Sequence, residues 1–325
     1  MPIASRLAFL ALCLPLPVHA QNGPQHELAP DERFAPRPVH RGRFAGLEDP
    51  RLAALRASGA VKWELDYGGF VLAGIDERAG GGAETLQASG IEWHDEQDRI
   101  LFDGLVIDAA RPRQTLARID PSEVIGDPLD ANLDPDAELY VVQFRGPARD
   151  EWLSELAAAG ATVVQYVPWN SYVVRVAPRE VALFGTLAAG RPEVQYLGVY
   201  EPAFRMSPRI RELGLTGPGG PQSVTVQLVE GPGADAAQRD LENLCTRVLP
   251  SLRVGPYRNV PCELDPVYFR WLAAHPGVFA IEERGTLHLN SGPASGPFDE
   301  RQGQISAGNF SGAAPTAPGL SLIHI

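Results

Sequence analysis

The chain has 325 residues, with 28 Lys and Arg against 40 Asp and Glu, so its formal net charge is −12. This acidity excludes binding to nucleic acid through a basic surface. With 44% hydrophobic residues the chain can bury substantial cores, and its length indicates two or three small domains.

The first 20 residues have the pattern of a secretory signal peptide. Arg6 lies in a short basic head, an apolar run extends from about Leu7 to Val18, and small residues at Val18 and Ala20 precede Gln21. The run is shorter than the about 20 residues of a membrane-spanning helix, and prolines interrupt it. We therefore expect cleavage after Ala20, a secreted or periplasmic protein, and no membrane contact after cleavage. A retained anchor is the alternative.

The next 117 residues divide into three stretches of different composition. Residues 21–48 are rich in Pro, Arg and Gly without a period, which predicts an extended leader. Residues 49–119 hold strand-like runs around one short helical stretch and form a first α/β module whose order the pattern does not define. Residues 120–137 are acidic and Pro-rich, which predicts a linker. Four of their five aspartates, at 127, 130, 134 and 136, have a spacing that lacks the glycine and terminal Glu of a calcium loop, so we expect no metal there.

Residues 138–206 show alternating strand and helix patterns. Strands are predicted at 138–144, 162–166, 172–176 and 193–202, and helices at 149–160 and 178–190. The order is β-α-β-β-α-β. Two right-handed βαβ crossovers joined by a hairpin place both helices on one face of an antiparallel sheet, the ferredoxin-like arrangement, and leave the other face free.

The same order returns in residues 223–290, after a linker at 207–222. Gln143 aligns with Gln227 and Leu187 with Leu272, offsets of 84 and 85 residues, which indicates an internal duplication. In the second copy Asp265 caps a helix and Pro266 occupies its first position. The fold class predicted is therefore α+β, with tandem ferredoxin-like modules whose helices lie on one face of antiparallel sheets.

Cys245 and Cys262 both lie in the second copy of this module. Of the three cysteines, Cys13 leaves with the signal peptide. An even pair in an oxidising compartment indicates a disulfide, which would tie the first helix of the module to its sheet edge. Closing this loop contributes about 3 kcal/mol in the chain-entropy model. Two free buried cysteines are the alternative.

A signal peptide followed by such modules, with "LAAHPGVFAIEE" as a short helix, a turn and a strand ending in acids, resembles the propeptide region of secreted bacterial subtilisin-like serine proteases. The segment "DERQGQISAGNFSGAAPTAPG" (residues 299–319) is similar to the link between prodomains and catalytic domain in long-propeptide members. The resemblance covers about residues 138–319, and residues 50–115 only loosely. It implies an intramolecular chaperone and temporary inhibitor whose partner is its own downstream catalytic domain. No individual functional residue of that family can be assigned to a position in this chain.

Catalytic residues of that family are not found in this chain. Subtilisin-like catalysis needs Asp, His and Ser motifs in that order. Ser295, in "GPASG", lacks the strand-turn-helix context of a nucleophile, and "WHDEQD" around His94 reads as a polar turn. His275 and His288 are single, and neither a zinc spacing nor a nucleotide-binding glycine pattern occurs, so we expect no catalytic, metal or cofactor site.

The chain ends in "LSLIHI", which looks like sequencing-adapter read-through after a Gly/Ala/Pro-rich stretch. We therefore expect residues 291–325 to be a linker with an artefactual end and the catalytic domain to follow it, with processing between about Gly285 and Gly319. A complete protein with a short tail is the alternative. A secreted binding or adhesion protein and a stand-alone protease inhibitor are the competing functions.

Overall fold

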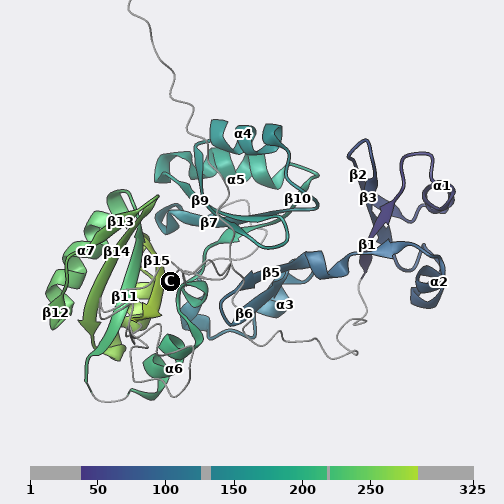
Figure 1. Cartoon of the computed structure of the whole chain (residues 1–325). Coiled ribbons are helices and arrows are strands. Elements are labelled where there is room, and N and C mark those ends of the chain that lie inside the picture. Colours follow the sequence, from purple (N-terminus) through teal and green to yellow (C-terminus); the bar gives the residue numbers. More distant parts are fainter. Residues whose placement is uncertain (1–37, 126–132, 218–219, 285–325) are drawn as a thin grey trace, which may run out of the picture.

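The structure, a computed structural model, describes residues 38–125, 133–217 and 220–284. Helices alternate with antiparallel strands through these residues, which confirms the predicted α+β class. The strands form three larger sheets and one two-stranded hairpin (Figure 1). The signal peptide and the tail after Arg284 lie outside the described residues, so signal cleavage, the processing segment and the reading of the chain end stay predictions.

The first unit (residues 39–93) begins inside the stretch predicted as an extended leader, so the leader boundary at residue 48 is wrong. Its first strand, "VHRGRF", pairs along its whole length with a neighbouring strand. The unit has the sheet order β2-β3-β1-β4. Its elements are β1 (Val39–Phe44), α1 (Pro50–Ala57), β2 (Val61–Asp66), β3 (Val71–Asp76), α2 (Ala83–Ala88) and β4 (Glu92–Trp93).

Local signals explain how the helices of the first unit begin and pack. The carboxylate of Asp49 accepts a hydrogen bond from the backbone N–H of Arg51 at 2.9 Å, and Pro50 occupies the first turn of α1. Leu52 of α1 and Leu86 of α2 are buried in one core with the strands. Both helices therefore cover the same sheet.

A hairpin connects the first and second units. It consists of β5 (Arg99–Phe102) and β6 (Leu105–Asp108), and helix α3 (Pro112–Leu116) follows it. The predicted linker 120–137 is in part a packed segment, because the carboxylate of Glu123 is buried 3.2 Å from Arg270 and 3.6 Å from Arg211. Asp134 accepts from the backbone N–H of Asp136 at 3.0 Å and so caps a short turn. The aspartates at 127 and 130 lie outside the described residues.

The second unit (residues 139–199) follows the order predicted for residues 138–206. Its sheet order is β10-β7-β9-β8. In β7, Tyr140, Val142 and Phe144 face a core that also holds Trp152 and Phe184 from the two helices, so both helices cover one face (Figure 1). The elements are β7 (Leu139–Phe144), α4 (Asp150–Ala158), β8 (Ala161–Val167), β9 (Ser171–Val176), α5 (Val181–Ala189) and β10 (Val194–Val199).

The third unit (residues 222–283) has the sheet order β12-β14-β11-β15, with β13 also paired to β14. Part of the predicted linker 207–222 is a helix, α6. Ser207 caps its start by accepting a hydrogen bond from the backbone N–H of Ile210. The elements are α6 (Pro208–Thr216), β11 (Gln222–Val229), α7 (Pro232–Leu244), β12 (Arg247–Val248), β13 (Leu252–Val254), β14 (Tyr257–Leu264), α8 (Phe269–Ala273) and β15 (Val278–Glu283).

Residues aligned between the two sequence copies occupy matching elements. Gln143 and Gln227 lie in the first strands of their units, and Leu187 and Leu272 lie in the second helices. Asp265 accepts from the backbone N–H of Val267 at 3.0 Å, as its predicted capping role requires. Within the described ranges, no helix is long and apolar enough to cross a bilayer.

Candidate functional site: a covered sheet face and an open sheet edge

The sheet face of the second unit that we expected to be free is covered by other parts of this chain. Leu139 and Val141 of β7 point away from the helices and are fully or almost fully buried. Ile100 and Ile107 of the β5–β6 hairpin pack against this face, and Phe279 of the third unit joins the same core. The expectation of a free face is therefore wrong for this sheet, because the hairpin and the third unit supply the apolar surface that covers it.

Aromatic rings fill the boundary between the second and third units. Phe279 of β15 lies 5.3 Å from the ring of Tyr200 and 5.0 Å from that of Tyr257. Phe102 of the hairpin stacks on Phe204 at 4.3 Å. These contacts make the inter-unit boundary a continuous core, whose members come from segments far apart in the sequence.

Arg205, completely buried, ties the exit of the second unit to the third. Its Nε and Nη2 donate to the carbonyl oxygen of Tyr200 at 3.0 and 2.6 Å, and its Nη1 donates to the carbonyl of His275 at 2.7 Å. Burial lowers the pKa of Arg205 to about 10, so it keeps its charge at neutral pH. Its hydrogen bonds to backbone carbonyls satisfy that charge, which would otherwise be costly to bury.

Arg41 makes the corresponding connection between the first unit and the second. Its Nη2 donates to the carboxylate of Asp98 at 2.6 Å and also to the side chain of Gln195 in β10. Burial lowers the pKa of Arg41, an effect that the negative charge of Asp98 opposes. The predicted polar turn around His94 is a short 3₁₀ turn, Asp95–Asp98, and it serves to hold the units together.

A second charged cluster surrounds His40 in β1. Its Nδ1 lies 2.6 Å from the Asp95 carboxylate and its Nε2 lies 3.2 Å from that of Glu77, and the hydrogen bond to Asp95 raises the pKa of His40. His94 pairs with Glu92 and Glu96 in a similar way. Both histidines are therefore placed as ion-pair partners of carboxylates.

The remaining histidine and serine candidates are His275, His288 and Ser295. His275 lies at the end of α8, 3.5 Å from Asp240, and burial lowers its pKa. His288 and Ser295 lie outside the described residues. Within the described ranges no three His, Cys, Asp or Glu side chains are placed to hold a metal ion.

Cys245 and Cys262 lie next to each other as thiols. Cys245 ends α7 and is half-buried, while Cys262 is buried in β14 and pairs in register with Val248 of β12. A hydrogen bond between the two thiols lowers the pKa of Cys245 and raises that of Cys262. The disulfide between them stays a prediction.

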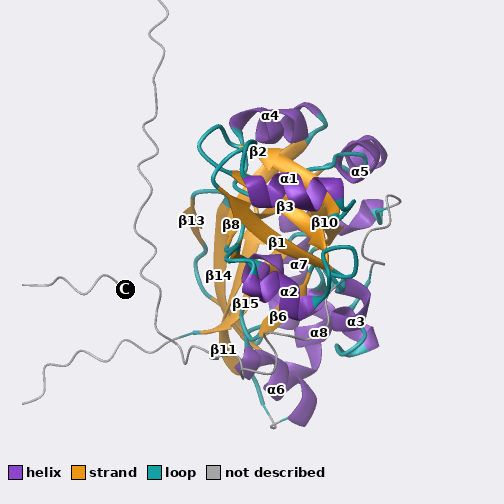
Figure 2. Ribbon diagram, turned by 90° about the vertical axis from the view of Figure 1, so that its right-hand side faces the viewer, coloured by secondary structure: helices purple, strands orange, loops and turns teal. Residues whose placement is uncertain are grey.

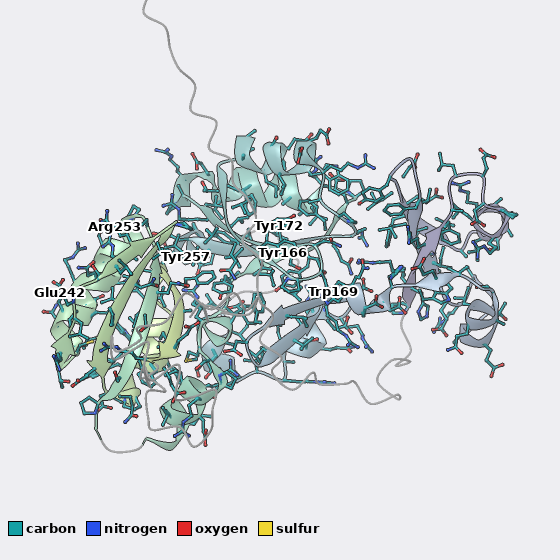
Figure 3. The ribbon with its side chains drawn as sticks, viewed as in Figure 1. Tyr166, Trp169, Tyr172, Glu242, Arg253 and Tyr257 are labelled. Atoms are coloured by element: carbon teal, nitrogen blue, oxygen red, sulfur yellow. The ribbon has the colours of Figure 1, made fainter. Side chains whose placement is uncertain are left out.

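Strand β8, the first half of the predicted hairpin 162–176, forms an open edge of the second sheet. It pairs only with β9 among the described residues. None of its seven residues is acidic or basic, and Val163 and Tyr166 are 43% and 55% exposed. Tyr166 packs against Tyr172 of β9 with ring centroids 5.4 Å apart (Figure 3).

The turn after β8 carries backbone strain that sequence patterns did not reveal. Trp169 and Asn170 have φ values of 65° and 61°, in the left-handed region, which Asn tolerates and Trp rarely adopts. The buried side-chain amide of Gln143 holds this turn by donating to the carbonyl of Trp169 at 2.9 Å. The same amide donates to the carbonyls of Gln97 and Arg99, so it also fixes the start of the hairpin.

Strand β13 of the third unit also carries exposed apolar residues. Val254 of β13 lies opposite Tyr257 of β14, whose hydroxyl donates to the side chain of Gln165 in β8 at 2.7 Å. Leu252 and Val254 are 64% and 54% exposed. Figure 2 labels β8 and β13, and Figure 3 shows Tyr257 between the third sheet and the second unit.

Comparison with known proteins finds a family that matches part of the chain. Residues 109–201 are similar to a family described as "Domain of unknown function (DUF8729)". The match includes α3, the segment after it and the whole second unit. No curated protein and no solved structure matches the chain.

Proposed function

We propose that the three units are tandem ferredoxin-like domains of a protease propeptide. The sheet orders support the fold assignment. Numbered within each unit, the strands run 4-1-3-2 in all three sheets, and each unit has the element order β-α-β-β-α-β, with β13 as an addition in the third. This is the split βαβ pattern, in which the first and third strands are central. The first module, which the sequence left undefined, joins the other two.

The function that fits best is that of an intramolecular chaperone and temporary inhibitor of a subtilisin-like catalytic domain in the same precursor. The observation that carries this proposal is the end of the third unit. Strand β15 finishes with the exposed residues Glu282 and Glu283, and the segment that resembles a prodomain-to-enzyme link, residues 299–319, follows further along the chain. An extended segment in that position can add to the edge of a protease cleft by main-chain hydrogen bonds.

The covered face changes where such a propeptide would touch its enzyme. Because the hairpin and the third unit bury the outer face of the second sheet, contact through that face would require the inter-unit core to open. Sheet edges and the segment after Arg284 are the surfaces that need no such opening. We therefore infer that inhibition depends on the segment after the third unit, with the folded units as its platform.

A secreted binding protein is the second candidate, and one observation favours it. Buried Arg41 and Arg205 fix the three units against one another, as expected for a scaffold that presents its edges to an unrelated partner. The gene sequence beyond codon 319 separates the candidates. An in-frame Asp, His and Ser triad supports the propeptide, a stop codon supports an inhibitor, and a cell-wall or repeat module supports the binding protein.

A further inference from the structure

We propose that strand β8 is a self-association site, which a second copy of this chain covers by antiparallel strand pairing. The inference concerns association of the chain with itself and is independent of the proposed inhibitory role.

The other edges of the three larger sheets are protected in ways that β8 is not. Strand β2 carries three charged residues, and β12 and β13 each carry an arginine. Strand β15 ends in two glutamates and is bridged by Met206 at Ile281, β4 carries Glu92, and β10 is buried over most of its length. Charges and coverage are the usual means by which folds prevent strand addition at an edge. Strand β8 carries no charge. In the described part of the chain its free side receives hydrogen bonds only from Tyr257, to the Val164 carbonyl at 3.4 Å and to the Gln165 side chain at 2.7 Å, and one register shift interrupts it between Val163 and Gln165. The residues on either side of that shift are therefore the least protected edge of the three sheets.

The chemistry of the edge identifies the occupant as an extended polypeptide. An edge strand presents backbone N–H and C=O groups at the spacing of a neighbouring strand, and these groups pair fully only with another backbone. The side chains then select the sequence. Because β8 has no acidic or basic residue, an identical strand laid antiparallel meets only neutral neighbours in any register, including Thr162, Val163 and Tyr166. Self-pairing about a twofold axis is also the commonest form of protein association.

The size of the surface predicts a weak dimer. Seven residues at roughly 3.3 Å each give a contact about 23 Å long, and the register shift between Val163 and Gln165 interrupts its regular part. Stable interfaces bury about 800 Å² on each partner, which one strand does not supply alone. Two copies with a formal charge of −12 also repel each other, so association should strengthen as salt screens that repulsion.

Sedimentation velocity of the chain beginning at Gln21, from about 1 to about 200 µM, tests the proposal. The expected result is a monomer–dimer equilibrium that tightens from about 0.05 to about 0.5 M salt. Val163→Lys should weaken dimerisation at least about tenfold, because a lysine on an edge strand opposes pairing. Val267→Lys, at an exposed apolar residue of the third unit, should leave the equilibrium unchanged.

Thr162→Lys serves as a second edge variant, and thermal unfolding identifies any variant that fails to fold. A chain that remains monomeric over the whole range at both salt concentrations overturns the proposal. Dimerisation of folded Val163→Lys and Thr162→Lys with the affinity of the unmodified chain overturns it as well, because the dimer would then use another surface.

Discussion

Replacing Phe279 by alanine tests whether the second and third units share one core. The ring is 7% exposed and contacts Tyr200 and Tyr257 across the boundary between the units. Burial of a phenylalanine removes at least about 150 Å² from water, equivalent to about 4 kcal/mol at 25 cal/mol per Å². Truncations of this kind usually cost about 3 to 5 kcal/mol. We expect the free energy of unfolding to fall by that amount.

Urea unfolding followed by both tryptophan fluorescence and far-UV circular dichroism provides the assay. Trp271→Ala is the matched control, because its ring is also aromatic but 51% exposed on α8, so its loss should cost less than about 1 kcal/mol. We also expect Phe279→Ala to separate the unfolding of the second and third units, so that the two probes no longer coincide. Equal losses in the two variants would refute the shared core.

Three further predictions follow from individual contacts. The hydrogen bond to Asp95 raises the pKa of His40, so this interaction stabilises the fold fully below the unfolded pKa of about 6.5 and is lost as pH rises through the higher folded value. His40→Asn should therefore reduce the urea midpoint at pH 5 more than at pH 9. An equal reduction at both pH values would contradict the assignment. Cys245 and Cys262 should be joined in secreted material, which non-reducing peptide mapping checks, and reduction should cost about 3 kcal/mol; two free thiols would show that the pair stays reduced. A Cβ at Gly277 would lie 2.2 Å from the backbone of Gly233, so Gly277→Ala should lower the free energy of unfolding by at least about 2 kcal/mol, whereas Gly46→Ala, with nothing within 4 Å, should change it little. Similar calorimetric melting curves for these two glycine variants would show that the close approach is absent.

Sequence patterns predicted the second and third units because their strands and helices have strong periodicity. Strand β7 is buried along its whole length, and its sequence is a continuous run of residues that favour β structure. Gly160 has a φ of 90° and follows the end of α4, as the sequence predicted. The sequence prediction of the first unit was incomplete because β1 contains His40, Arg41 and Arg43 and shows no apolar alternation. Its partner β4 has only two residues. Such strands exist because neighbouring elements bury them, which a local pattern does not show.

The contacts between units were not predictable from local pattern for a related reason. Arg41 and Arg205 look like surface residues in the sequence, yet each is buried where two distant segments meet. Gln143 was noticed because it aligns with Gln227, but the two side chains have different roles. Gln143 holds the hairpin and the β8–β9 turn, whereas Gln227 donates only to Asn259 in the neighbouring strand. Repetition of a residue therefore predicted its element and not its partners.

Inhibition of the catalytic domain by this chain tests the proposed function most directly. The measurement is the rate of peptide hydrolysis by the catalytic domain that the proposed precursor would carry, with the chain from Gln21 to Gly319 added in trans. We predict stoichiometric inhibition that is lost when the chain is cleaved, and retained inhibition by a fragment that keeps residues 38–319. An active catalytic domain whose rate does not change at any concentration of the added chain would contradict the account.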